Sequence, residues 1–258
     1  MNNFDDLVTK GCDIIFLSPL DPKAMVEKIK LAETQGIKVV LFAINMDGED
    51  FTASVNSKDY DIGRLNAEWI AKDAGVKGKV ALLSGIAGTQ TAIDVKNGVV
   101  DVLKNYPDIE LLPEIFTDWD WAKVKKATQD VLAANPDIAG IIVHGDPIYV
   151  AQVFIESGKK LVPIPWQSSN GALRFWKEQK PNGLKARAFN KPAYISKVAL
   201  DIGMKALKGE EIPKFTEVPL DIINEDQIDD FYRPDLSDRV WLPTYLPDDV
   251  VIKLFPKE

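Results

Sequence analysis

The chain has 258 residues, of which 46% are hydrophobic and 27% are charged, a composition typical of a globular protein. A net charge of −8 without any block of Lys and Arg argues against a nucleic-acid partner, because phosphate neutralisation needs a basic face. One cysteine excludes an internal disulfide, and one histidine leaves a zinc site poorly supplied with ligands, so we expect neither a metal nor a cofactor. The apolar runs have the length of strands, too short to span a membrane.

Strands and helices alternate along the chain. Buried strands are predicted at residues 13–17, 39–42, 80–83, 138–143, 161–165, 184–189 and 218–223, with an extended segment at 110–117. Helices are predicted at 3–10, 24–34, 62–74, 91–106, 122–135, 148–157, 171–179 and 193–208. This alternation with short connections predicts parallel sheets with right-handed crossovers. About six strand–helix units favour two α/β lobes over an eight-stranded barrel.

The stretch after the strand at 80–83 predicts a ligand-binding edge. Small residues at 84–89 form a loop, and an apolar helical period begins at Thr91. In open α/β sheets, ligands bind at the carboxyl ends of the strands, where loop N–H groups and helix N-termini meet. We therefore expect the loop at 85–89 to form one wall of a ligand cleft.

Several short motifs carry a family resemblance by their order and spacing. They are GCDII with the following PLD at 11–21, GIKVV at 36–40, GIAGT at 85–89 followed by Gly98, NPDI at 135–138, GDP at 145–147 and ALKG at 206–209. Together they resemble periplasmic sugar-binding proteins of the ribose-binding type, which are the solute receptors of ABC importers. The resemblance implies an α/β fold of two doubly wound parallel-sheet lobes, of the type I periplasmic-binding-protein kind, joined by a hinge of several chain crossings.

The resemblance also implies where the lobes divide. We expect the first lobe at 1–117 plus 191–217, and the second lobe with the tail at 118–190 plus 218–258. Family members start with one more strand–helix–strand unit, so this chain resembles an amino-terminally truncated member whose first lobe is incomplete. An uncovered edge strand would then favour self-association through that lobe. Residues 1–6 do not resemble a signal peptide, whereas the family resemblance implies a periplasmic or lipid-anchored extracellular location.

The function implied by the resemblance is that of a receptor rather than an enzyme. It would bind a sugar or sugar-like polyol in the cleft between the lobes, close on it, and deliver it to an ABC transporter permease. An alternative is the effector-sensing domain of a transcription regulator of the same fold, although no basic helix-turn-helix is visible. A dehydrogenase is disfavoured, because the loop at 85–88 lacks GxGxxG and the single His144 has no nucleophile partner in sequence.

The residues at the ribose-contacting positions of the family indicate that ribose is not the ligand. The polar groups of ribose-type members correspond here to Ala43, Ile93, Trp121, Gly145, Gln167 and Asn190. Only Asn190 keeps the kind of polar side chain, an amide, that the family has at its position. Because a site built to hydrogen-bond one sugar rejects ligands that lack its groups, these replacements predict a different sugar, a polyol or a less polar small molecule.

Eight residues are candidate ligand contacts: Asn45, Gln90, Trp119, Trp121, Asp146, Trp166, Gln167 and Asn190. Amide and carboxylate groups suit sugar hydroxyls, and indole faces suit sugar C–H surfaces. Asn45 and Gln90 are polar residues of loops at the cleft edge. Trp166 and Gln167 directly follow a strand and are expected to face the cleft.

Other roles remain open for part of this set. Trp119 and Trp121 flank a helix start, where one of them could line the cleft and either could belong to the core. Asp146 precedes a proline and is favoured as a helix cap over a ligand contact. The tail at 233–247 has no clear period and is expected to wrap a surface. Its Trp241 and Tyr245 are expected to pack there, although a tail near the hinge could reach the ligand.

Overall fold

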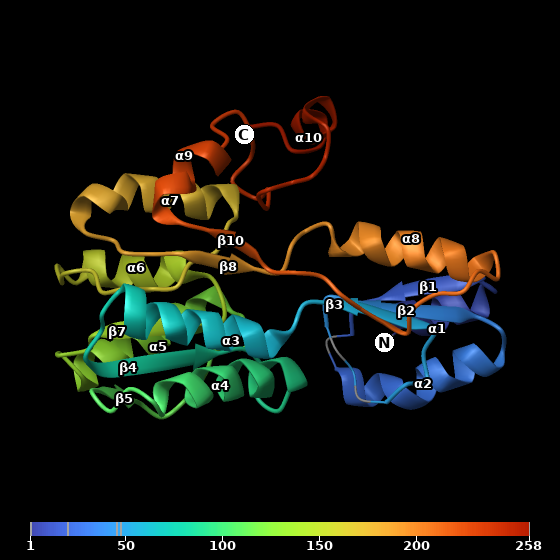
Figure 1. Cartoon of the computed structure of the whole chain (residues 1–258), viewed down its shortest axis with the longest axis horizontal. Helices are drawn as coiled ribbons and strands as arrows, with labels where there is room; N and C mark the ends of the chain where they lie inside the picture. Colours follow the sequence, from blue (N-terminus) through green and yellow to red (C-terminus); the bar gives the residue numbers. More distant parts are fainter. Residues whose placement is uncertain (1, 20, 45, 47, 258) are drawn as a thin grey trace. The chain divides into compact units, whose positions relative to one another are not determined.

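The structure is a computed structural model that describes residues 2–19, 21–44, 46 and 48–257 (Figure 1). It divides into two compact units. Unit 1 consists of Met1–Lys58 and Lys191–Pro219, and unit 2 consists of Asp59–Asn190 and Leu220–Glu258. The chain therefore crosses between the units three times, as the predicted fold of two α/β lobes requires.

The predicted first boundary, at residue 117, is wrong. The structure assigns residues 59–117 to unit 2, where strand β4 (Gly78–Ser84) pairs with β7 (Gly140–Val143). Strand–helix units look alike in sequence, and hydrophobic periodicity does not record which strand a given strand will pair with. The last crossing falls after Pro219, two residues beyond the predicted position.

Unit 1 is built on a four-stranded parallel sheet. Its strands lie in the order β1 (Ile14–Leu17), β2 (Lys38–Phe42), β3 (Ala53–Asn56) and β9 (Phe215–Glu217). The short strand β3 was not predicted from the sequence. In place of the single strand predicted at 218–223, the structure has two short strands on either side of the crossing at Pro219. They are β9 in unit 1 and a strand at 221–223 in unit 2.

Helices cover both faces of the unit 1 sheet (Figure 1). Helices α1 (Asn2–Thr9) and α2 (Pro22–Thr34) pack with Val39 and Leu41 on one face. Helix α8 (Ile195–Leu207) packs with Val40 and Val55 on the other. Alternate residues of β2 thus enter two separate cores, which explains why every residue of the strand after Lys38 is apolar.

Unit 2 has β4 at the centre of its sheet. Strand β4 pairs in parallel with β5 (Ile109–Leu111), β6 (Ile115–Phe116) and β7. Strand β8 (Ala188–Asn190) pairs with β10 (Asp221–Ile223) in the antiparallel direction. Strand β8 is the last segment of unit 2 before the chain crosses to unit 1, and β10 follows directly on its return, so the two run in opposite directions.

The strand predicted at 161–165 forms only isolated contacts. Ile141 N–H donates to the Pro163 carbonyl, Ile164 N–H donates to the Lys185 carbonyl, and Trp166 forms a parallel bridge with Ala188. The segment therefore lies between β7 and β8 without a continuous ladder. Pro163 and Pro165 have no N–H to donate, which accounts for the interruption.

The helical elements of unit 2 are α3 (Asp59–Glu68), which continues as the π-helix η1 (Trp69–Asp73), α4 (Gln90–Leu103), α5 (Trp121–Ala134), α6 (Pro147–Glu156), α7 (Asn170–Gln179), the 3₁₀ turn η2 (Lys180–Asn182), the 3₁₀ turn η3 (Glu225–Gln227), α9 (Ile228–Phe231) and α10 (Asp248–Leu254). Helices α3 to α7 lie close to their predicted positions, whereas the short helices η2, η3, α9 and α10 were not predicted from the sequence. Helices α3 and α4 approach each other through Gly63 and Gly98. A Cβ on Gly98 would lie 2.2 Å from the Tyr60 carbonyl oxygen, so this position requires glycine. None of the described helices combines the length and the hydrophobicity that a membrane-spanning helix needs.

Candidate ligand-binding site

The carboxyl ends of the parallel strands of unit 2 lie at one edge of its sheet. The segments that follow β4, β6 and β7 are residues 85–89, 117–120 and 144–146. The segment after Trp166 joins the same edge, because Trp166 bridges β8 in parallel. Most of the candidate side chains therefore come from segments that follow neighbouring parallel strands of unit 2, and we name this set of segments the strand-end site.

The loop at 85–89 ends on a capped helix. Thr89 is the N-cap of α4, and its hydroxyl accepts a hydrogen bond of 3.3 Å from the Ala92 N–H. The next residue, Gln90, donates from Nε2 to Asp94 Oδ1 at 2.8 Å. The expected strand–loop–helix arrangement is confirmed, and Gln90 lies at the helix start.

Trp119 lies directly on this loop. Its backbone has a left-handed φ of 56°, and its indole packs so closely on Gly85 that a Cβ there would lie 2.4 Å from Nε1. The indole also meets the His144 ring edge-on, with centroids 5.6 Å apart. Trp119 is half-buried, so it presents part of a fixed aromatic surface at the strand-end site.

Trp121 lies outside that arrangement. It is the first residue of α5, it is 58% exposed, and its ring tilts against Tyr149 of α6 at a centroid distance of 5.6 Å. The two tryptophans thus have different surroundings, although only Asp120 separates them. Neither is fully buried in the core.

Asp146 is the N-cap of α6, as the sequence predicted. Its Oδ1 accepts a hydrogen bond of 3.0 Å from the Ile148 N–H. Burial raises the pKa of the Asp146 carboxyl, and the hydrogen bond from Ile148 lowers it by a smaller amount. A carboxylate oxygen of the cap can still accept a bond from a ligand hydroxyl.

The structure contradicts a ligand-facing role for Trp166. The side chain is 3% exposed, its Nε1 donates to the Ala172 carbonyl at 2.9 Å, and its ring stacks on Phe175. Both the apolar surface and the N–H group of the indole are therefore used inside unit 2. The position after a strand predicted exposure, but alternation along the chain turns this residue inward.

Gln167 and Asn190 lie on neighbouring segments of the site. Gln167 is half-buried, and Asn190 is 7% exposed at the end of β8. Asn190 Oδ1 accepts a hydrogen bond of 3.3 Å from the Ser168 N–H, which ties the two segments together. The Nδ2 group of Asn190 has no hydrogen-bond partner within the described part of the chain. Such an amide has donors left for a ligand.

In unit 1, only part of the predicted contacts can be placed. Asn45 lies outside the described residues. Ala43, the position of a family carboxylate, has a left-handed φ of 63°, and its carbonyl accepts a hydrogen bond of 2.6 Å from Lys191 Nζ. Lys191 thereby links the carboxyl end of β2 to the start of the return segment of unit 1.

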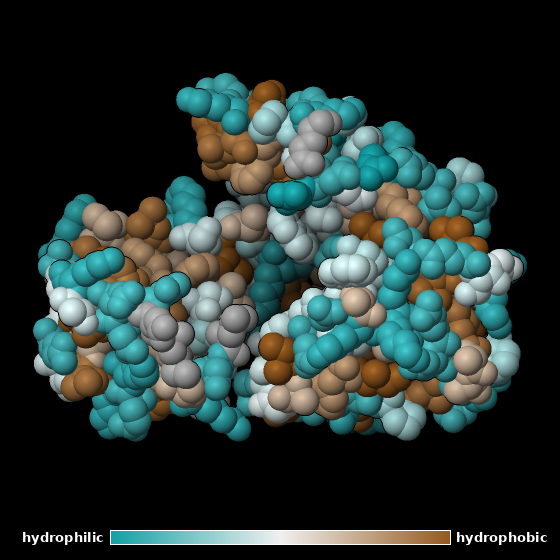
Figure 2. Space-filling view, turned by 180° about the vertical axis from the view of Figure 1, so that it is seen from behind, coloured by the Kyte–Doolittle hydropathy of each residue, from teal (hydrophilic) through white to brown (hydrophobic). Residues whose placement is uncertain are grey.

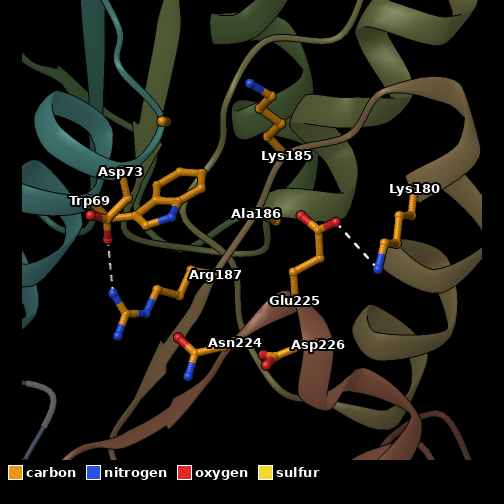
Figure 3. A pocket seen from close by; sticks show the side chains of 10 residues that line it. Trp69, Asp73, Lys180, Lys185, Ala186, Arg187, Asn224, Glu225 and Asp226 are labelled. Carbon is orange, nitrogen blue, oxygen red and sulfur yellow. Dashed lines mark hydrogen bonds and ion pairs between the residues drawn. The ribbon is translucent and has the colours of Figure 1, made fainter.

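Unit 2 also has a hollow at the other end of β8 (Figure 3). It encloses about 490 Å³ and is lined by Trp69, Asp73, Ala74, Lys180, Lys185, Ala186, Arg187, Asn224, Glu225 and Asp226. Two ion pairs lie along its wall, Arg187 with Asp73 at 3.0 Å and Lys180 with Glu225 at 3.3 Å. Much of its charge is neutralised internally, so we place the candidate site at the strand ends instead. Among the described residues, no group of three or more His, Cys, Asp and Glu side chains is arranged to hold a metal ion.

Two features of the site were not predicted from the sequence. One is the contact of Trp119 with Gly85 and His144, which joins three loops that are distant in sequence. The small residues at 84–88 hinted at close approach by a neighbour, but not by which one. The other is the hydrogen bonding between the tail and the 168–171 segment, which includes a bond of 2.7 Å from the Asn170 N–H to the Val240 carbonyl.

Comparison with known proteins identifies similar folds. A family model described as "Periplasmic binding protein domain" matches residues 1–211. The ribose import binding protein RbsB of Bacillus subtilis is 24% identical over 221 residues, which is 85% of this chain and 71% of that protein. An ABC transporter solute binding protein of Agrobacterium vitis, solved with D-fucose, has a TM-score of 0.80 at 24% identity, covering 88% of this chain and 80% of its own. One from Bacillus halodurans, solved with myo-inositol, has a TM-score of 0.79 at 17% identity, covering 89% and 80%.

Proposed function

The chain is a member of the periplasmic binding protein family, and on this basis we propose that it is the receptor of an ABC importer for a sugar or sugar-like polyol other than ribose. Relatives of this chain are binding proteins for ribose, D-fucose and myo-inositol, judged by their names and bound molecules. The ligand class, rather than one ligand, is what they share. We also propose that the protein works outside the cytoplasmic membrane, as its periplasmic relatives do.

The observation that carries this proposal is the fixed indole of Trp119 at the strand-end site. The ring packs on Gly85 and makes a T-shaped contact with the His144 ring, so little conformational entropy is lost when a ligand packs against it. Sugars and cyclic polyols present C–H surfaces to an aromatic ring and hydroxyls to polar groups. Asn190 and Gln167 would supply amide groups for those hydroxyls.

Ribose itself is disfavoured within this class. Of the six positions at which ribose-type members hold polar groups, five carry a different chemistry here, and only Asn190 keeps it. A buried polar site discriminates strongly against a ligand that leaves its groups unpaired. We therefore expect ribose to bind more weakly than another pentose, hexose or cyclic polyol.

A thermal-shift panel tests the proposal. Purified protein is heated with D-ribose, D-allose, D-fucose, D-arabinose, xylitol or myo-inositol at increasing concentration. At one hundred times its Kd, a ligand adds about 2.7 kcal/mol of stability, which raises the Tm by roughly 5–10 °C for a protein of this size. We expect at least one compound other than ribose to do so.

Two matched variants locate the ligand. Trp119→Ala should abolish the ligand-dependent rise in Tm, whereas Trp121→Ala should retain it, because Trp121 contacts Tyr149 instead of the strand-end loops. A panel without any stabilising compound contradicts the proposed ligand class. Equal stabilisation of wild type and Trp119→Ala contradicts the proposed site.

We further propose that unit 1 self-associates through the open side of its sheet. Strand β1 ends the order β1-β2-β3-β9, and its Phe16 is only half-buried. A Cβ on Gly203 would lie 2.7 Å from the Phe16 ring, so α8 lies close over this edge strand.

The outer flank of α8 beside Gly203 is apolar and exposed. Leu200, Met204 and Leu207 recur at helical spacing on it and are 48%, 44% and 38% exposed, and hydrophobic residues lie over α8 in Figure 2. An open strand edge next to an apolar helix flank is a template for a second copy of the same surface.

Analytical ultracentrifugation tests the self-association. We expect a dimer that dissociates in Met204→Glu but not in Leu254→Glu, which changes an equally apolar residue of α10 that is 59% exposed. A wild-type monomer at all concentrations, or a dimer that persists in Met204→Glu, would refute the proposed self-association of unit 1.

A further inference from the structure

The carboxyl-terminal tail lies outside the family match yet is bound to the strand-end site. The family model covers residues 1–211, and the tail contacts begin at residue 233. Leu242 N–H donates to the Ser168 carbonyl at 3.0 Å, and Ser168 Oγ donates to the Leu242 carbonyl at 2.5 Å. The segment after Trp166 is thus paired with the tail on one side and, through Ser168 N–H, with Asn190 on the other.

The pairing has the geometry of a short antiparallel ladder. Ser169 and Trp241 face each other in an antiparallel bridge, and the flanking bonds run from Leu242 N–H to Ser168 and from Asn170 N–H to Val240. This pattern makes the bridged pair a non-hydrogen-bonded pair, in which the side chains lie close together on one face. Trp241 and Ser169 therefore share a face of the ladder.

Burial shows which face this is. Val240 and Leu242 are 4% and 5% exposed and belong to the core of unit 2, whereas Trp241 between them is 43% exposed. On the facing segment, Ser168 and Asn170 are buried, while Gln167 and Ser169 are half-buried. Because successive side chains of an extended chain alternate, Gln167, Ser169 and Trp241 point to the same side, away from the core.

A second aromatic residue of the tail reaches the other end of the site. Tyr245 Oη donates to Asp221 Oδ1 at 2.8 Å, and Asp221 is the ladder partner of Asn190. Burial raises the pKa of the Asp221 carboxyl, and the bond from Tyr245 offsets part of this rise. The stretch from Trp241 to Tyr245 therefore runs from the Gln167 segment to the β8–β10 pair.

We propose that Trp241 is a specificity-determining residue that adds a second aromatic surface to the ligand site beside Gln167, with the tail acting as the segment that positions it. This inference rests on the proposed function. The tail needs no rearrangement of the fold to do this, because its backbone is already paired with the site. A large indole next to an amide suits a ligand with an extended C–H face, such as a hexose or a cyclic polyol, better than a small acyclic one.

Variants of three exposed or half-exposed aromatic residues test the inference. Trp241→Ala removes the proposed surface. Phe255→Ala is the matched control, because Phe255 is an aromatic residue of the tail that is 38% exposed and its backbone bonds to Ser237, away from the site. Trp119→Ala reports whether the strand-end site itself binds. Isothermal titration with the most stabilising compound of the panel gives a Kd for each protein, and unfolding without ligand reports on the fold.

The expected result is a Kd raised at least tenfold by Trp241→Ala and changed less than twofold by Phe255→Ala, with the Tm of both ligand-free variants close to that of wild type. Across the panel, Trp241→Ala should lose more affinity for cyclic compounds than for xylitol. If wild type binds, Trp119→Ala does not, and Trp241→Ala binds like wild type, the inference about the tail is refuted while the proposed function stands. If wild type binds no compound, the proposed function is refuted, and the inference about Trp241 is refuted with it. Trp241→Phe guards against misfolding, since it should recover most of the affinity lost in Trp241→Ala.

Discussion

Replacement of Asn170 by alanine should weaken the attachment of the tail to unit 2. Asn170 is 1% exposed and makes three hydrogen bonds with the tail through its side chain. Nδ2 donates to the carbonyls of Arg233 at 2.7 Å and Leu236 at 3.0 Å, and Oδ1 accepts from the Arg233 N–H at 2.9 Å. A net value of about 1 kcal/mol for each bond gives a loss of about 3 kcal/mol in the free energy of unfolding. For a protein of this size the Tm should fall by roughly 6–12 °C.

The measurement is thermal unfolding followed by circular dichroism, with Asn182→Ala as the matched control. Asn182 is exposed and makes one side-chain hydrogen bond, from Nδ2 to Gln179 Oε1 at 3.0 Å. Its replacement should change stability by no more than about 0.5 kcal/mol. The Asn170 variant should also bind ligand more weakly, because Asn170 is next to the Ser168–Leu242 pairing. Equal Tm values for the two variants would refute the reasoning.

Two further changes test the packing and electrostatics of unit 2. Gly98→Ala places a Cβ 2.2 Å from the Tyr60 carbonyl oxygen, so α3 and α4 must separate. We expect the free energy of unfolding, measured in urea, to fall by about 1–3 kcal/mol, although alanine has the better helix propensity. The control Val100→Ala, on the exposed face of α4, should change it by no more than about 0.5 kcal/mol. An unchanged midpoint for Gly98→Ala would show that the helices separate without cost. Asp146→Asn keeps the cap of α6 and removes a carboxyl whose pKa is raised by burial. Because the folded wild type holds the Asp146 proton more tightly than the unfolded chain does, wild type should lose stability relative to Asp146→Asn as the pH rises above the ordinary Asp pKa of 3.8. A stability difference between the two proteins that does not change with pH would contradict the assigned pKa direction.

Most of the helices and the class of fold could be predicted from the sequence, whereas strand β3 and the helices of the tail could not. Apolar runs such as 80–83 and 138–143 are apolar on every residue, which is the pattern of strands covered on both faces, and β4 and β7 lie there. Helix caps could also be predicted, because Asp146 precedes a proline and its side chain accepts a hydrogen bond from the Ile148 N–H of its own helix. Motif order identified the family without any structural information.

Contacts between segments that are far apart in the chain could not be predicted from the sequence and became known only from the structure. Periodicity could not show that β4 pairs with β7, and the boundary predicted at 117 was therefore wrong. Nor could it show that Trp166 turns inward to bond with Ala172 while Trp119 lies on Gly85. The tail has no period of its own, because its conformation depends on the 168–171 segment it pairs with. Local sequence records which faces are apolar, whereas the neighbours of those faces follow from the packing of the whole unit.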